Sequence, residues 1–183
     1  MPSRQRRLFL RAIGTAMSVG VGGCAGRSTG GTADDTATTT ADDPLTLPSA
    51  VTTGDLPDGR VRLVAPGTVT LLNFFTTWCR PCQREMSEFR ALRAEYDTDA
   101  LHMVSITPEV DETLVEEFWA EYEGTWPVVM DPALTATERW NANRYPTNLL
   151  FDADGTPASD GPEVRARTFE EFDALIEPLV AEA

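Results

Sequence analysis

One stretch of the sequence indicates both the fold and the chemistry: residues 69–85 read VTLLNFFTTWCRPCQRE. The run opens with residues 69–75, which are nearly all apolar and β-prone, and this predicts a strand buried on both faces. Cys79 and Cys82 follow at the point where a helix should begin. Two thiols three positions apart at a helix start can close a disulfide, or open to a dithiol, with little backbone movement.

The helix start predicts different roles for the two cysteines. Cys79 falls at the amino end, where unpaired backbone N–H groups and the helix dipole favour thiolate over thiol. Arg80 adds a positive charge beside it. We therefore expect Cys79 to be the nucleophile and Cys82, one turn further along and more buried, to be the resolving thiol. Pro81 fits the first helical turn, where a missing N–H costs nothing.

Strands and helices alternate through the rest of the globular part, which predicts an α/β sandwich. Apolar runs predict further strands at residues 101–106, 128–130 and 147–151. Amphipathic spacing and capping residues predict helices after Cys82, at residues 111–122, from Asp131 and from Thr168. Turn residues predict a hairpin at 51–63 and a short or irregular edge strand at 156–167.

The amino-terminal part predicts export and anchoring. Residues 1–23 hold a basic stretch and then an uncharged segment too short to cross a ~30 Å hydrocarbon core, and Arg6 to Arg11 resemble a twin-arginine export motif. The residues before Cys24 resemble a lipoprotein cleavage box, which predicts lipidation of Cys24. Residues 24–49 have no apolar period and predict a flexible tether to a domain at 50–183. A disordered basic terminus and a free exposed thiol are the alternatives.

The charge excludes one class of function. The chain has 29 Asp and Glu against 15 Lys and Arg, a formal net charge of −14, and all 15 cations are arginine. Beyond residue 23 the balance is 11 arginines against 29 acids, or −18. Nucleic-acid binding needs a basic face, so we expect no nucleic-acid partner. The lack of lysine and the abundance of acids resemble the proteins of halophilic archaea, where molar salt screens the repulsion.

Residues 72–85 together with Tyr145, Pro146 and Thr147 resemble the TlpA/ResA-like membrane-anchored thiol-disulfide oxidoreductases of the thioredoxin family. The resemblance covers roughly residues 50–183. It implies a thioredoxin-like α/β fold, in which helices flank a central mixed β-sheet, with an N-terminal hairpin and a central helical insert at 111–122.

The same resemblance assigns residues around the cysteines. It implies that Pro146 is a cis-proline facing the disulfide, which leaves the Tyr145 backbone free to pair with a substrate strand. An ordinary trans turn proline is the alternative. Trp78 is expected to cover the disulfide and to shape the substrate surface with Arg80 and Pro81, and simple core packing is its alternative reading.

A carboxyl group is the remaining candidate. The family commonly has Asn at the position of Asn73 and a Glu three residues past the second cysteine, which is Glu85 here. A half-buried Glu85 would have a raised pKa and could exchange a proton with Cys82. The alternative is a solvated helix acid such as Glu88.

The implied function is reduction of protein disulfides at the outer face of the cell membrane by a lipid-anchored, monomeric enzyme. Cytochrome c apoprotein is one possible substrate, and a membrane-embedded thiol donor would supply electrons. We expect no cofactor beyond the Cys79–Cys82 disulfide and no metal, because a structural zinc site needs four ligands and only Cys24 and His102 remain.

Three alternatives on the same fold stay open. A disulfide-forming oxidase differs in redox potential, which Arg80 and Pro81 do not settle. A peroxiredoxin-like peroxidase usually has Pro-x-x-x-Thr-x-x-Cys; Thr76 fits that pattern, but Leu72 stands at the proline position. A copper-delivery protein needs C-x-x-x-C and a distant histidine, for which only His102 is available.

Overall fold

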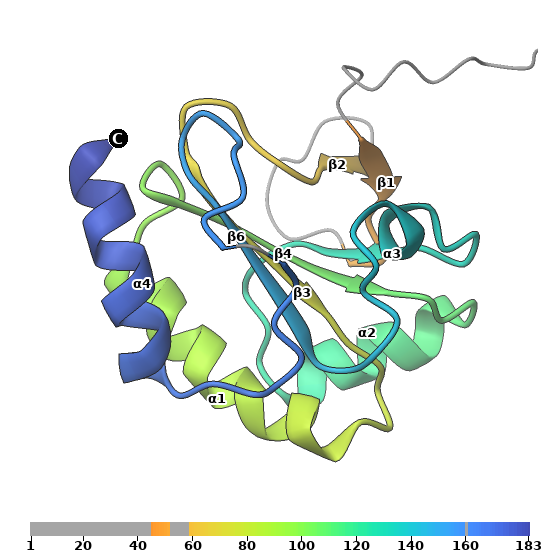
Figure 1. The fold of residues 1–183 in the computed structure, drawn as a ribbon. Coiled ribbons are helices and arrows are strands. Elements are labelled where there is room, and N and C mark those ends of the chain that lie inside the picture. The colour runs from red at the N-terminus through yellow and green to blue at the C-terminus, as the bar shows by residue number, and fades with distance from the viewer. Residues whose placement is uncertain (1–44, 52–58, 160) are drawn as a thin grey trace, which may run out of the picture. The chain divides into compact units, whose positions relative to one another are not determined.

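The structure, a computed structural model, describes residues 45–51, 59–159 and 161–183 (Figure 1). The predicted signal at 1–23, Cys24 and most of the predicted tether lie outside the described residues. Among the helices of the described ranges, none combines the length and the apolar character needed to cross a membrane.

A four-stranded mixed sheet forms the centre, in the order β5-β4-β3-β6. Its strands are β3 (Val69–Phe74), β4 (Leu101–Thr107), β5 (Val128–Met130) and β6 (Thr147–Phe151). Strand β4 runs parallel to both β3 and β5, whereas β6 is antiparallel to β3. The predicted mixed sheet is therefore confirmed, with β3, the strand before the cysteines, at an interior position.

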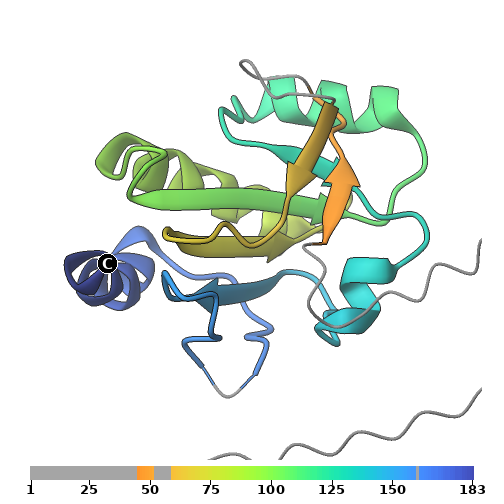
Figure 2. The same ribbon diagram turned by 90° about the horizontal axis from the view of Figure 1, so that it is seen from above.

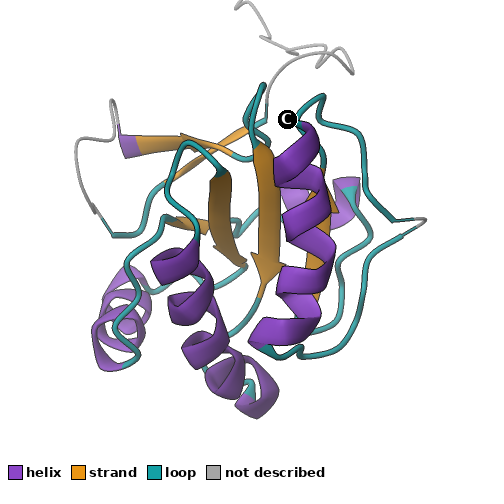
Figure 3. Cartoon of the chain, turned by 90° about the vertical axis from the view of Figure 1, so that its left-hand side faces the viewer, coloured by secondary structure: helices purple, strands orange, loops and turns teal. Residues whose placement is uncertain are grey.

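Helices cover one face of this sheet. They are α1 (Arg80–Glu95), α2 (Glu112–Glu121) and α4 (Phe169–Glu182), and Figure 3 shows α1 and α4 in front of the strands. Their buried side chains join Leu71 and Phe75 in one apolar cluster. Burial of these side chains removes apolar surface from water and holds the helices to the sheet.

A hairpin and a short helix cover the opposite face. The hairpin consists of β1 (Thr46–Pro48) and β2 (Arg60–Arg62), and the helix is α3 (Thr135–Arg139). In Figure 2 these elements lie on the right and α4 lies on the left. They pack with Leu72 and Phe74 in a second apolar cluster. Strand β3 is buried on both faces, as its continuous apolar run predicted.

The hairpin differs from its prediction. Its first strand is Thr46–Pro48, not a strand beginning at Val51, and Leu47 is buried against the sheet. Residues 45–49 therefore belong to the folded part and not to the predicted tether at 24–49. The strand was missed because it has only three residues, includes Pro48 and lies among polar residues, so no apolar periodicity marks it. Its pairing of Leu47 with Val61 is visible only in the structure.

Helix α3 also begins later than predicted. It starts at Thr135, not directly after Asp131, because residues 131–134 form a turn in which Leu134 has a positive φ of 58°. The Asp131 carboxylate still reaches the helix, accepting hydrogen bonds of 2.9 Å from both N–H and Oγ1 of Thr137. The predicted cap at Asp131 and first turn at Pro132 are therefore wrong, because Leu134 is the N-cap residue and makes no side-chain capping bond.

The segment after β6 confirms the prediction of an irregular edge. Its described residues contribute two isolated bridges to the sheet, Asn148 with Glu163 and Phe151 with Pro157. Helix α4 then begins after Thr168, which forms the predicted capping box with Glu171. The chain between β6 and α4 therefore passes over the edge of the sheet close to α1.

Candidate active site

The two cysteines of the motif form a disulfide at the start of α1. Their Cα atoms are 5.2 Å apart. Cys79 is the N-cap residue, and its Sγ accepts a hydrogen bond of 3.3 Å from the N–H of Cys82. Pro81 lies in the first turn. The predicted helix start is confirmed, and the sulfur of Cys79 lies where backbone N–H groups stabilise negative charge.

Two side chains fix the loop before the disulfide. Glu109 Oε1 accepts hydrogen bonds from the N–H (2.7 Å) and the Oγ1 (2.8 Å) of Thr77. Gln83, in α1, donates from Nε2 to the carbonyl of Thr77 at 2.7 Å. Glu109 was not predicted from the sequence, because it is 32 residues from Thr77 along the chain. These bonds hold the backbone next to Trp78 and Cys79 in place.

An open groove of about 550 Å³ lies over Cys79. It is lined by Trp78, Cys79, Arg80, Pro81, Asn143, Arg144, Tyr145 and Val164. The Tyr145–Pro146 peptide bond is cis, as predicted. Trp78 is 72% exposed, so core packing does not explain it. Cys79 lines the groove although it is only 5% exposed, whereas Cys82 does not line it and is 2% exposed.

The structure brings all four predicted substrate residues to this groove. Trp78, Arg80, Pro81 and Tyr145 all line it, although Tyr145 is separated from the others by more than 60 residues of sequence. Asn143 and Arg144 line it too and were missed. Their position just before Tyr145 and the cis-proline was the available signal.

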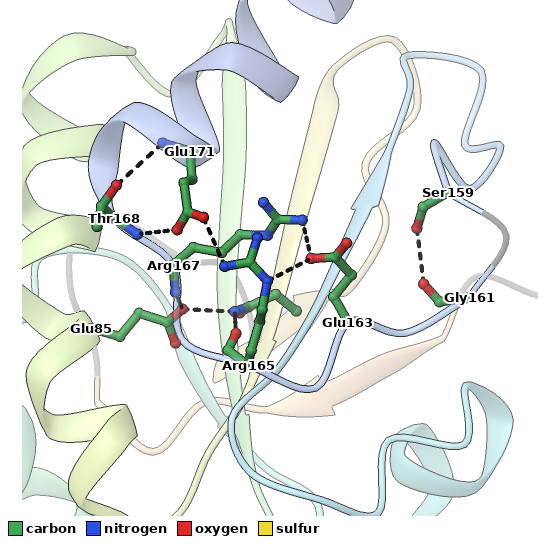
Figure 4. Close-up of polar contacts among 9 residues, drawn as sticks. Glu85, Ser159, Gly161, Glu163, Arg165, Arg167, Thr168 and Glu171 are labelled. Carbon is green, nitrogen blue, oxygen red and sulfur yellow. Dashed lines mark hydrogen bonds and ion pairs between the residues drawn. The ribbon is translucent and has the colours of Figure 1, made fainter.

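Glu85 is buried, at 1% exposure. Its Oε1 accepts hydrogen bonds from Asn148 Nδ2 (2.8 Å) and from the backbone N–H of Arg167 (2.9 Å), while Oε2 is buried without a partner among the described residues (Figure 4). Burial raises the pKa of Glu85 from 4.5 to about 7, and the two hydrogen bonds oppose that rise. A solvated helix acid is therefore the wrong description.

Glu85 shares a helix face with the buried cysteine. Cys82 and Glu85 are three residues apart in α1, and both are buried in the same direction. Residues three apart on a helix are neighbours, with Cβ atoms roughly 5–6 Å apart. A carboxyl group with a pKa near 7 in that position is suited to proton exchange with a thiol.

A chain of buried hydrogen bonds leads to Glu85 across the sheet. Trp126 Nε1 donates to Ser105 Oγ (2.9 Å), and Ser105 Oγ donates to Asn73 Oδ1 (3.3 Å). Asn73 Nδ2 then donates to Asn148 Oδ1 (2.9 Å), and Asn148 Nδ2 donates to Glu85. Every donor points toward the carboxyl group, an arrangement in which the bonds polarise one another.

Sequence reasoning found Asn73 but missed its partners. Ser105 and Asn148 lie opposite Asn73 in β4 and β6, so the three side chains meet at one level of the sheet. The available signal was an Asn or Ser within each of three largely apolar strands, because buried polar groups need partners.

The loop before α4 closes over Glu85 (Figure 4). The side chain of Arg167 pairs with Glu163, and that of Arg165 pairs with Glu171 at 2.8 Å. The Arg167 side chain is nearly buried, with an exposure of 10%. Its backbone N–H donates to the Glu85 carboxylate. These pairs position the edge segment over α1.

His102 lies away from the disulfide. In β4 it pairs with Thr70 near the start of β3, whereas Cys79 follows the carboxyl end of that strand. Its Nε2 is 2.8 Å from the carbonyl of Arg62, and burial lowers its pKa. The copper-delivery alternative thereby loses its histidine, because the chain contains no other.

A mixed sheet with helices on one face and a disulfide at the start of the helix after an interior strand defines a thioredoxin-like fold. Solved structures agree: a putative thiol:disulfide interchange protein DsbE from Chlorobium tepidum is similar with a TM-score of 0.64 and 21% identity, over 75% of this chain and 94% of that one. The Redoxin family matches residues 34–176, and the chain belongs to that family.

Curated relatives match the central part. Thiol-disulfide oxidoreductase ResA of Bacillus cereus is 29% identical over 89 residues, which is 49% of this chain and 51% of that protein. Thioredoxin-like protein YneN of Bacillus subtilis is 35% identical over 94 residues, 50% of this chain and 54% of that protein. The chain thus spans about half the length of these relatives.

Proposed function

We propose that this protein is a thiol-disulfide oxidoreductase that reduces disulfides in partner proteins outside the cytoplasm. The observation that carries the proposal is the placement of the two sulfurs. Cys79 caps α1 and lines an open groove, whereas Cys82 is bonded to it from the buried side. The relatives named thiol-disulfide oxidoreductases support the reaction class.

The reaction begins from the reduced dithiol. The Cys79 thiolate attacks one sulfur of a partner's disulfide, which forms a mixed disulfide and releases the partner's other sulfur as a thiolate. Cys82, deprotonated, then attacks Cys79, which closes the Cys79–Cys82 bond and releases the second partner sulfur. Two electrons pass to the partner, and a membrane-embedded thiol donor restores the dithiol.

Glu85 supports the second step. As a carboxylate it takes the proton of the Cys82 thiol, and with a pKa of about 7 it holds that proton without a large energetic penalty. Its Oε2 is the atom assigned to this transfer, because Oε1 already accepts two hydrogen bonds.

The groove binds the partner segment. Trp78 offers an exposed apolar surface beside Cys79, and Arg80 and Pro81 form the adjoining wall. Next to Pro146, the Tyr145 backbone pairs with an extended partner strand. The shared groove of Cys79 and Tyr145 supports this arrangement.

The place of action is proposed from the amino-terminal sequence. Residues 1–23 direct export, lipidated Cys24 anchors the protein to the cell membrane, and a tether beginning there has a reach of roughly 25–30 Å. We propose a monomer that acts on protein disulfides, cytochrome c apoprotein among them. The lysine-free, acidic composition supports a halophilic archaeal source.

Trapping of the mixed disulfide tests the assignment. Cys82→Ser should accumulate a covalent, reductant-sensitive complex between Cys79 and a partner, because the resolving thiol is gone. Cys79→Ser should accumulate none. Complexes formed by Cys79→Ser and not by Cys82→Ser would reverse the two roles, and the absence of complexes in both variants would reject the proposed reaction.

A further inference from the structure

The groove over Cys79 has a charge opposite to that of the chain. The sequence contains 29 acidic residues and 15 arginines, and its formal net charge is −14. Of the eight residues that line the groove, two are arginines and none is acidic. A random sample of this chain's charged residues would favour acids, so the composition of the groove requires an explanation.

The two groove arginines are available to a partner. Arg80 and Arg144 are both exposed. Within the described ranges neither forms an ion pair, whereas Arg90, Arg165 and Arg167 all pair with glutamates. Exposed guanidinium groups without an intramolecular partner bind carboxylates in a two-pronged geometry.

The acidic residues near the motif are directed elsewhere. Glu109 accepts hydrogen bonds from the N–H and Oγ1 of Thr77 at its Oε1. Glu85 is buried beneath the site. Neither lines the groove, so the charge that a bound segment meets directly is that of the arginines.

The arginines reach the groove of the reacting sulfur from two parts of the fold. Arg80 lies between the two cysteines at the start of α1, and Arg144 precedes Tyr145 in the loop before β6. Because both line the groove with Cys79 and Tyr145, a partner strand that pairs with Tyr145 and presents its sulfur to Cys79 meets both arginines.

We propose that this groove selects partner segments whose cysteines are flanked by Asp or Glu, with Arg80 and Arg144 binding the flanking carboxylates. The inference rests on the proposed function and specifies its substrate class. Trp78 supplies the apolar contact common to all partners, and the arginines supply the preference.

Three synthetic peptides test the preference. They share one intramolecular disulfide and differ only in the residues that flank the cysteines, which are Asp and Glu, Asn and Gln, or Lys. The reduced full-length protein is mixed with each peptide, and kcat/KM is measured with a thiol donor in excess. The assay is run at about 1 M salt, in keeping with the acidic, lysine-free composition, where the Debye length is about 3 Å and charges outside the groove contribute little.

The acidic peptide should react roughly tenfold faster than the neutral one, and the lysine peptide should react more slowly still. In the R80Q/R144Q variant the ratio of acidic to neutral rates should fall to about one, and R144Q alone should lower it partway. Because each ratio compares two peptides on one variant, any effect of Arg80 on the reactivity of Cys79 cancels. R62Q, which removes an exposed arginine from the hairpin on the other face, is the matched control and should keep the wild-type ratio.

Equal rates for the acidic and neutral peptides, or a preference that survives R80Q/R144Q, would overturn the inference while leaving the reductase function in place. Faster reaction of the lysine peptide would also overturn it. Failure to reduce any of the three peptides would instead contradict the proposed function itself, and the inference would fall with it.

Discussion

Asn148 donates its side-chain amide to Glu85 across 2.8 Å, although the two residues are 63 positions apart in the sequence. The bond joins the edge strand of the sheet to the helix that carries the disulfide. It is the last of four hydrogen bonds that run from Trp126 through Ser105 and Asn73. The carboxyl group beside Cys82 is therefore held by the sheet and not only by its own helix.

Replacement of Asn148 by Leu should raise the pKa of Glu85 above its value of about 7. The amide hydrogen bond stabilises the carboxylate, and its loss is expected to shift the pKa by roughly one unit. Carbon-detected NMR titration of the Glu85 carboxyl group measures the shift. Asn143→Leu, an exposed residue of the groove, is the control and should leave the titration unchanged. An unaltered titration in Asn148→Leu would show that this bond does not hold the carboxylate.

Glu85 should make the folded protein less stable as the pH rises. Its pKa in the folded state, about 7, is above the ordinary value of 4.5, so the folded state holds the proton more tightly than the unfolded state. The stability that this proton contributes is fully present below about pH 4.5 and is lost as the pH rises through about 7. The free energy of unfolding of the wild type should therefore fall relative to Glu85→Gln by about 3 kcal/mol across that window.

Denaturant unfolding of the oxidised proteins at several pH values measures this difference, because oxidation removes the two thiols from the titration. Glu95→Gln, which changes an exposed acid at the end of the same helix, is the matched control and should not reproduce the slope. A difference between wild type and Glu85→Gln that stays constant with pH would place the carboxyl group in contact with solvent.

Glu85→Gln should also slow the second chemical step, in which Cys82 resolves the mixed disulfide. Without a carboxylate next to Cys82, the thiol must lose its proton to water, and resolution of the mixed disulfide should slow roughly 100-fold near pH 7. The release of the second partner thiol, followed by stopped flow over a range of pH, reports this step. An unchanged rate and pH profile would reduce Glu85 to a structural residue.

The local parts of the site were predictable from sequence because each depends on neighbours in the chain. The position of Cys79 as a helix cap follows from a turn, a proline and an apolar stripe within a few residues. Glu85 was expected to be half-buried and is fully buried, and that burial raises its pKa in the expected direction. The cis bond before Pro146 came from the family resemblance and is confirmed as well.

The long-range parts were not predictable, because they depend on strand register. Asn148 reaches Glu85 only because β6 pairs with β3 so that Asn148 stands opposite Asn73. A register shift of one residue would turn it to the other face. The first strand of the hairpin was missed for the same reason, because the pairing of Leu47 with Val61 joins residues distant in sequence.

Cys24→Ala should release the protein from membranes, because a lipid on that cysteine is the proposed anchor. Cell fractionation followed by immunoblotting compares the variant with the wild type. Cys82→Ser is the control, since it also removes a thiol but leaves the proposed anchor intact. Retention of Cys24→Ala in the membrane fraction would refute the lipid anchor.

The central claim is that Cys79 and Cys82 donate electrons to partner disulfides. Equilibration of the purified protein with defined thiol–disulfide buffers, followed by quantification of the two redox forms, gives the reduction potential of the pair. A reductase requires a value near that of thioredoxin, about −270 mV, and this is the predicted result. A value near −120 mV, which is typical of a strong disulfide-forming oxidase, would contradict the claim.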